Sequence, residues 1–182
     1  MNRLTRRSML AGLCGAGAVM AGGERRYQFA QTHMGAPVVV TLFAGSPGQA
    51  ERAAIAAFQR IAQLDAILSD YRNDSEVLGL SRVAPGVDTA VSPDLFRVLE
   101  HSQTIAEESG GAFDPTAAPV IRLWRQARRR GRLPDPVKIR AALKAVGYRN
   151  FVLNPAARTV RLLRHGMRFD FRGMAKGFAA GE

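Results

Sequence analysis

Two serine–proline pairs limit where the helices of this chain can begin. Ser46-Pro47 and Ser92-Pro93 each place a hydroxyl residue that can cap a helix before a proline that the first helical turn tolerates. Apolar residues then recur at helical spacing over residues 54–68 and 95–105. Pro134-Asp135-Pro136 opens another segment of this kind. The sequence therefore predicts about three amphipathic helices.

Apolar residues at a period of two predict strands before and after these helices in the sequence. Residues 27–32 and 37–43 form an expected pair of strands, and the second is apolar enough to be buried. Residues 151–153, 159–163 and 167–171 are expected to form an antiparallel meander joined by turns. The predicted fold class is α+β, a mainly antiparallel sheet with about three packed amphipathic helices.

Composition permits one domain and excludes a disulfide framework. A chain of 182 residues with 47% hydrophobic content can bury one core. The single cysteine, Cys14, excludes an internal disulfide and a cysteine-based metal site. The net charge of +11 favours anionic partners. Nucleic acid is not expected among them, because the basic run at residues 122–132 has no interleaved aromatics and is better explained as a solvated helix end.

Residues 1–21 are predicted to be an export signal, outside the folded domain. An arginine-rich start precedes an uncharged apolar and glycine run at residues 9–20, which is too short to span a bilayer as a stable helix. Thr5-Arg6-Arg7-Ser8-Met9-Leu10 looks like a twin-arginine signal. The mature domain then covers residues 22–182, and its expected location is exported, periplasmic or inner-membrane-associated.

The segment Arg168-Phe-Asp-Phe-Arg-Gly-Met-Ala-Lys-Gly177 is a candidate ligand site. An alternating strand leads into a Gly-Met-Ala-Lys-Gly loop, where glycines allow a ligand close to the backbone and Lys176 adds a cation. The spacing differs from that of a Walker loop. A phosphate cradle and an ordinary turn with one exposed lysine both fit the segment alone.

Four segments, in this order along the chain, resemble the ApbE family of FAD:protein FMN transferases. They are Met34-Gly35-Ala36, Leu68-Ser69-Asp70-Tyr71, residues 110–116 with the later Leu123-Trp124, and Asp170-Phe-Arg-Gly-Met-Ala-Lys-Gly177. The resemblance implies Mg²⁺-dependent transfer of FMN from FAD to a Ser or Thr hydroxyl of an acceptor protein, with release of AMP. The alternatives are an FAD-binding module and an FAD pyrophosphatase without a protein acceptor.

The resemblance also implies which residues contact the flavin nucleotide. Met34 and Tyr71 are expected to offer a thioether and an aromatic surface to the ring. Ala112, Phe113 and Asp114 are expected to bind the cofactor as well. For Asp114 the alternative is an Asx turn that caps the backbone two residues on.

The phosphate end of the nucleotide is assigned to the closing segment. The resemblance places Lys176 beside the phosphates, as a cofactor-binding and catalytic residue, and gives Mg²⁺ the backbone carbonyl of Ala175. Asp170 is expected to support the loop. Arg172 and Ala36 depart from the residues usual in the family, which adds one cation and removes one hydroxyl.

The resemblance covers the N-terminal half, or slightly more, of a typical family member. The remaining half carries an Asp and a Thr that complete the metal site, and one carbonyl with water is too little for a dedicated Mg²⁺ site. We therefore expect either a fragment of a longer product or a shortened relative of doubtful activity. The implied partners are FAD and an acceptor redox protein at the membrane. The oligomeric state is not predicted.

Overall fold

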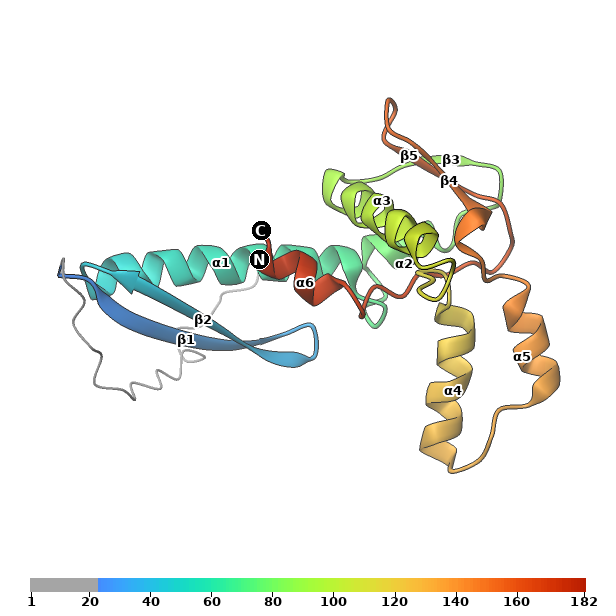
Figure 1. The fold of residues 1–182 in the computed structure, drawn as a ribbon, viewed down its shortest axis with the longest axis horizontal. Coiled ribbons are helices and arrows are strands. Elements are labelled where there is room, and N and C mark those ends of the chain that lie inside the picture. Colours follow the sequence, from blue (N-terminus) through green and yellow to red (C-terminus); the bar gives the residue numbers. More distant parts are fainter. Residues whose placement is uncertain (1–22) are drawn as a thin grey trace. The chain divides into compact units, whose positions relative to one another are not determined.

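The computed structural model describes residues 23–182, so the export signal predicted at residues 1–21 lies outside the described residues. The chain divides into two compact units, and the division falls between Asp65 and Ala66, inside the long helix α1 (Pro47–Leu68) (Figure 1). Both units contain helices, and the strands pair antiparallel. The predicted α+β class is confirmed. Over residues 23–182 no helix is long and apolar enough to cross a membrane.

The first unit contains a β-hairpin that confirms the two predicted strands. Strand β1 (Arg25–His33) pairs with β2 (Ala36–Ala44) along its whole length. Met34 and Gly35 form the turn with φ values of 50° and 69°. Two consecutive positive φ values are typical of the type I′ turn, whose twist matches that of a hairpin.

The expected burial of the second strand is wrong. Along β2 the side chains alternate between half-buried and exposed, and Val39 and Phe43 are 57% and 51% exposed. Only one face of a two-stranded hairpin can pack against one helix, because an isolated hairpin has no second layer. His33 marks the packed face, since its ring stacks on Phe58 of α1 with 5.7 Å between centroids.

The second unit holds the remaining elements. Its helices and strands are α2 (Glu76–Leu80), β3 (Asp88–Ala90), α3 (Pro93–Glu108), α4 (Ala118–Arg130), α5 (Pro136–Leu143), a 3₁₀ turn (Tyr148–Asn150), β4 (Phe151–Asn154), β5 (Thr159–Leu162) and α6 (Ala175–Ala180). The predicted helix starts are confirmed, because the side chains of Ser92 and Asp135 accept the N–H groups of Leu95 and Val137.

The predicted three-stranded meander is wrong in its last member. Strands β4 and β5 pair as expected, but the place on the other side of β5 is taken by β3, which the sequence did not predict. Residues 167–171 run as an extended segment with one parallel bridge, between Ala117 and Arg168. The Asp170 N–H donates to the Pro115 carbonyl at 2.8 Å.

The side chains of this extended segment explain why it resembles a strand in sequence. Met167, Phe169 and Phe171 are each 1% exposed and form the core of the second unit. Phe169 stacks on Phe171 at 5.7 Å and meets Phe151 of β4 edge-on at 5.3 Å. The alternation therefore reflects packing into the core and not a ladder of backbone hydrogen bonds. This core fixes the position of Asp170 between the phenylalanines.

Candidate functional site

Asp114 fastens the loop that follows α3. Its Oδ1 accepts the backbone N–H of Thr116 at 2.8 Å and the Thr116 hydroxyl at 2.6 Å, and its Oδ2 accepts the Tyr148 N–H at 3.0 Å. The buried Thr116 Oγ1 accepts the Gly147 N–H at 2.7 Å. Of the two predicted roles, the structure shows the Asx turn. Contact between Asp114 and a flavin nucleotide stays a prediction.

The neighbouring loop residues lie beside the closing segment. Ala112 is exposed and Phe113 is half-buried. A Cβ atom on Gly173 would lie 3.7 Å from Cε2 of Phe113, so the phenyl ring borders this glycine. The fold thus brings together two of the segments on which the family resemblance rests, about 60 positions apart in sequence.

The closing segment is only partly a loop. Ala175 and Lys176 belong to helix α6, where a loop was expected. The helix is held by contacts on its inner side: Met174 Sδ lies 2.8 Å from Ser102 Oγ, and the Phe178 ring meets His101 edge-on at 6.1 Å. Ala175 is buried, whereas Lys176 is exposed and has no ion-pair partner among residues 23–182.

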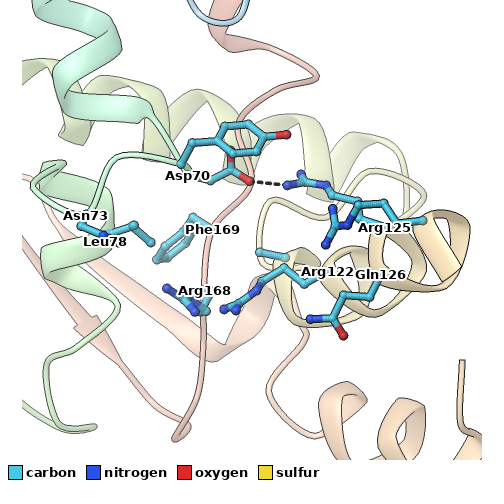
Figure 2. Close-up of a pocket in the computed structure, with 11 residues that line it drawn as sticks. Asp70, Asn73, Leu78, Arg122, Arg125, Gln126, Arg168 and Phe169 are labelled. Carbon is cyan, nitrogen blue, oxygen red and sulfur yellow. Dashed lines mark hydrogen bonds and ion pairs between the residues drawn. The ribbon is translucent and has the colours of Figure 1, made fainter.

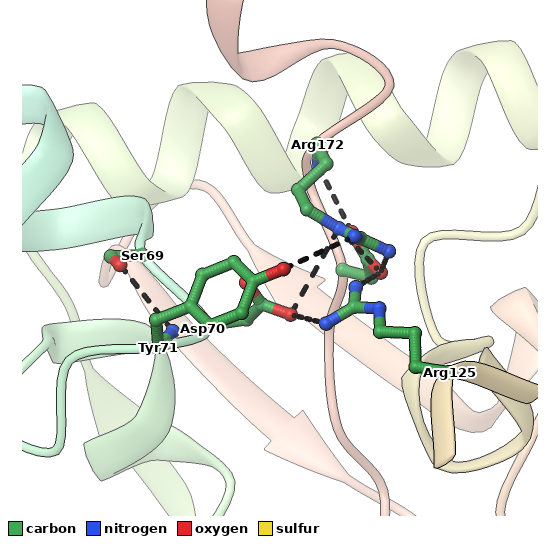
Figure 3. Close-up of polar contacts among 6 residues, drawn as sticks. Ser69, Asp70, Tyr71, Arg125 and Arg172 are labelled. Atoms are coloured by element: carbon green, nitrogen blue, oxygen red, sulfur yellow. Dashed lines mark hydrogen bonds and ion pairs between the residues drawn. The ribbon is translucent and has the colours of Figure 1, made fainter. Parts of the chain in front are cut away.

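A cluster of four charged side chains links α4 to the closing segment (Figure 3). Arg125 donates to Asp70 Oδ2 at 2.8 Å and to Asp170 Oδ2 at 2.7 Å. Arg172 binds Asp170 through its backbone N–H at 3.0 Å and through its guanidinium at 2.7 Å. The sequence placed Asp70 in a family segment and Arg125 in a basic run, but no sequence signal connected the two.

Tyr71 lies over this cluster with its ring largely in solvent. The guanidinium carbon of Arg125 is 5.4 Å from the ring centroid, and Arg172 Nη1 is 3.4 Å from the phenol oxygen. The residue is 70% exposed. A cation against one part of an aromatic ring holds the ring in place and leaves the rest available to a ligand.

The carboxyl group of Asp170 has a raised pKa. Burial, together with the negative charge of Asp70, raises the pKa of Asp170 to about 6, and Arg125 opposes this shift. The carboxyl side chain is 4% exposed. The charge of the cluster therefore changes in mildly acidic solution.

A pocket of about 330 Å³ opens beside the cluster (Figure 2). Asp70, Tyr71 and Arg125 line one part of it, and Phe169 lies on its floor. Of the predicted site residues in the second unit, Tyr71 alone is among those that line this pocket. Met34 lies in the hairpin turn of the first unit.

The residues of the described part do not supply a magnesium site. No group of three or more His, Cys, Asp or Glu side chains placed to hold a metal is found in residues 23–182. Asp70 and Asp170 already accept hydrogen bonds from arginines. Ala175 is the first residue of α6, and a carbonyl at that position points toward the N–H four residues on. Mg²⁺ usually needs several oxygen ligands in octahedral geometry, which this set does not offer.

The fold is that of known flavin transferases. The flavin transferase ApbE from Vibrio cholerae superposes with a TM-score of 0.79 at 18% identity, over 87% of this chain and 52% of that one. The apo form of the Pseudomonas stutzeri flavinyl transferase ApbE gives 0.77 at 24% identity, over 87% and 50%.

The sequence defines the family directly. The family model described as "ApbE family" matches residues 34–182, and the chain belongs to this family. The FAD:protein FMN transferase of Treponema pallidum is 32% identical over 177 residues, which are 92% of this chain and 48% of that protein. The protein of the same name from Klebsiella pneumoniae is 26% identical over 157 residues. The chain spans about half the length of these relatives.

Proposed function

We propose that this chain belongs to a transferase that moves FMN from FAD to a Ser or Thr hydroxyl of an acceptor protein and releases AMP. The observation that carries the proposal is family membership over residues 34–182, with relatives named FAD:protein FMN transferase. The exposed Tyr71 ring, fixed at a pocket, supports it, because a flavin needs an aromatic surface for stacking.

Five of the predicted site residues have a role in this proposal that their environment supports. Tyr71 stacks on the flavin ring, and Ala112 and Phe113 border the nucleotide from the neighbouring loop. Asp114 holds that loop in shape through its three accepted hydrogen bonds. Lys176, exposed and without an ion-pair partner among the described residues, offsets the charge of the pyrophosphate.

The reaction exchanges the phosphoanhydride bond of FAD for a phosphate ester. The acceptor hydroxyl oxygen forms a bond to the FMN phosphorus and gives up its proton, the bond from that phosphorus to the bridging oxygen breaks, and AMP leaves with the bridging oxygen. Positioning and charge neutralisation supply most of the acceleration in such transfers. Within this chain, Lys176 is the residue proposed to supply that charge.

Mg²⁺ dependence, export and a membrane-associated acceptor redox protein complete the proposal for the whole transferase. The family resemblance motivates the first and the last, and the arginine-rich start of the sequence motivates export. Because residues 23–182 do not supply a magnesium ligand set, no step in this chain is assigned to the metal.

A binding module without turnover is the second candidate, and the missing ligand set is the observation that favours it. It would bind FAD but release no AMP. An FAD pyrophosphatase would release AMP and leave the acceptor unmodified. These three outcomes separate the candidates in one assay.

The assay mixes the 182-residue chain with FAD, Mg²⁺ and a protein substrate of a flavin transferase. AMP is measured by chromatography and the acceptor by mass spectrometry. The proposal expects AMP and flavin-bearing acceptor in equal amounts, and a loss of at least tenfold in rate with Lys176→Met, because a charged hydrogen bond to phosphate is lost. Lys138→Met, an exposed lysine of α5, is the matched control and should not change the rate. FAD binding without AMP would contradict the proposal and favour the module.

A further inference from the structure

Four arginines line the pocket beside α4, and carboxylates pair with only one of them among the described residues. Arg122, Arg125 and Arg129 of α4 line it together with Arg168 of the extended segment. Arg125 is balanced by Asp70 and Asp170. Within residues 23–182 the guanidinium groups of Arg122, Arg129 and Arg168 have no hydrogen-bond acceptor and no ion-pair partner. Three uncompensated cations therefore share one small space.

Helix geometry explains how α4 concentrates these cations. Positions 122, 125, 126 and 129 follow the spacing that places side chains on one helical face. That face borders the pocket, and Arg122 and Arg129 on it are exposed. Arg128 and Arg130 are exposed as well but do not line the pocket. Figure 2 shows Arg122 and Arg168 among the side chains that line the pocket. The basic run was predicted to be a solvated helix end, but three of its arginines, Arg122, Arg125 and Arg129, line a pocket.

The floor of the pocket is apolar. Leu78, Ala118 and Phe169 line it and are 5%, 4% and 1% exposed. An apolar floor lowers the local dielectric constant, so repulsion between the arginines and attraction to an anion are both stronger than in water. The amides of Asn73 and Gln126 add neutral hydrogen-bonding groups to the lining.

We propose that this pocket binds a small phosphate-bearing anion, of the class of pyrophosphate or a nucleoside mono- or diphosphate. The planar guanidinium fork matches phosphate oxygens in pairs, and several arginines together neutralise a multiply charged group. A volume of 330 Å³ lies at the lower end of small-molecule pockets, so it suits one phosphorylated group and not a whole dinucleotide. The proposal rests on the arginines. For the pyrophosphate of FAD as the anion it also rests on the proposed function and deepens it, and for a free anion it goes beyond that function.

Two sources could supply such an anion. One is the pyrophosphate of FAD itself, and the other is a free nucleotide or pyrophosphate that binds beside FAD. The chemistry of recognition is the same for both. Competition between FAD and inorganic pyrophosphate for the pocket distinguishes them.

The test measures binding of inorganic pyrophosphate to the full chain by calorimetry at constant ionic strength. The variant that combines Arg122→Gln and Arg168→Gln removes two lining cations, and Arg128→Gln with Arg130→Gln removes two cations from the same helix outside the pocket. We expect the pocket variant to bind about 100-fold more weakly, at about tenfold for each charge-assisted contact. The control should stay within about threefold of the parent chain.

Equal affinity of the two double variants, or no binding by the parent chain, would overturn the proposal. Circular dichroism shows whether the pocket variant folds. If it does not, Arg129→Gln alone should lower the affinity about tenfold, and unchanged binding by that variant overturns the proposal equally. If FAD displaces pyrophosphate, the anion is part of the dinucleotide, and if both bind together, it is a separate ligand. Both results support the site.

Discussion

Replacing Arg125 with Gln should destabilise the second unit through the two carboxylates that it bridges. The change removes hydrogen bonds of 2.8 Å and 2.7 Å to Asp70 and Asp170. Charged hydrogen bonds contribute about 1.5–3 kcal/mol each, and Arg172 still pairs with Asp170, so about 3 kcal/mol should be lost. The substitution also removes the Nε of Arg125, which is buried without a hydrogen-bond partner, and this offsets a small part of the cost.

The cost should depend on pH in a defined direction. Removing Arg125 removes the charge that opposes the raised pKa of Asp170, so the folded variant holds that proton to higher pH than the parent chain. The folded variant then binds more protons than the unfolded chain over a wider range of pH. Within that range, the free energy of unfolding falls as pH rises. The loss in free energy of unfolding should therefore be larger at pH 8 than at pH 5.

Urea denaturation at the two pH values measures both effects. Arg161→Gln is the matched control, because it breaks a pair with Asp88 in which both side chains are about half exposed. Solvent screens such a pair, so it contributes little to stability. The reasoning is refuted if Arg125→Gln costs no more than Arg161→Gln, or if its cost is the same at pH 5 and pH 8.

Three further predictions concern single groups. In the parent chain, stability should fall as pH rises from about 4 to about 6, because the folded state binds the Asp170 proton more tightly than the unfolded chain, and Asp170→Asn should remove this fall. The same dependence of melting temperature on pH in both proteins would contradict this. Asp114→Ala removes three accepted hydrogen bonds and should lower the free energy of unfolding in urea by about 2–3 kcal/mol. The control Asp135→Ala removes one helix cap and should cost about 1 kcal/mol, and equal costs would show that Asp114 does not hold its loop in place. Gly147→Ala should cost about 1–3 kcal/mol, because φ is 143° and the new Cβ would lie 2.5 Å from the Asn150 amide; an unchanged melting temperature would refute it.

The local structure was largely predictable because its signals are local. The serine at position 92 and the aspartate at position 135 cap helices as predicted, since a cap needs only its own side chain and the next turn. The hairpin at Met34-Gly35 followed from two apolar runs with a short connection. Helix α3 ends at Glu108, just before Gly110 and Gly111, which take positive φ values of 60° and 85°.

The errors have one cause, which is that partners distant in sequence decide what a pattern becomes. Alternation at residues 167–171 predicted a strand. Instead, Phe151 meets Phe169 edge-on, and the Pro115 carbonyl accepts the Asp170 N–H. Strand β3 has too few residues to show a period and exists because β5 lies beside it. Lys176 was placed in a loop because its glycines suggest one, but contacts of Met174 and Phe178 favour a helix.

The candidate site divides in the same way. The sequence identified Tyr71 and residues 110–116 through the family resemblance, and the structure places Tyr71 at a pocket. It could not connect Asp70, Arg125 and Asp170, because an ion pair across 45 or 55 positions has no local signal. Two of the three unpaired arginines, Arg122 and Arg129, lie in a run that also contains solvated ones, and the third, Arg168, lies in the extended segment.

Binding of FAD tests the central claim most directly. Titration of FAD with the full chain, followed by flavin fluorescence, should show saturable quenching as the ring stacks against Tyr71. Tyr71→Leu should weaken binding about tenfold and leave the melting temperature unchanged, because the side chain is 70% exposed. Phe43→Leu changes an exposed aromatic outside the proposed site and should bind as the parent does. No quenching by the folded parent chain, or equal affinity of the two variants, would contradict the account.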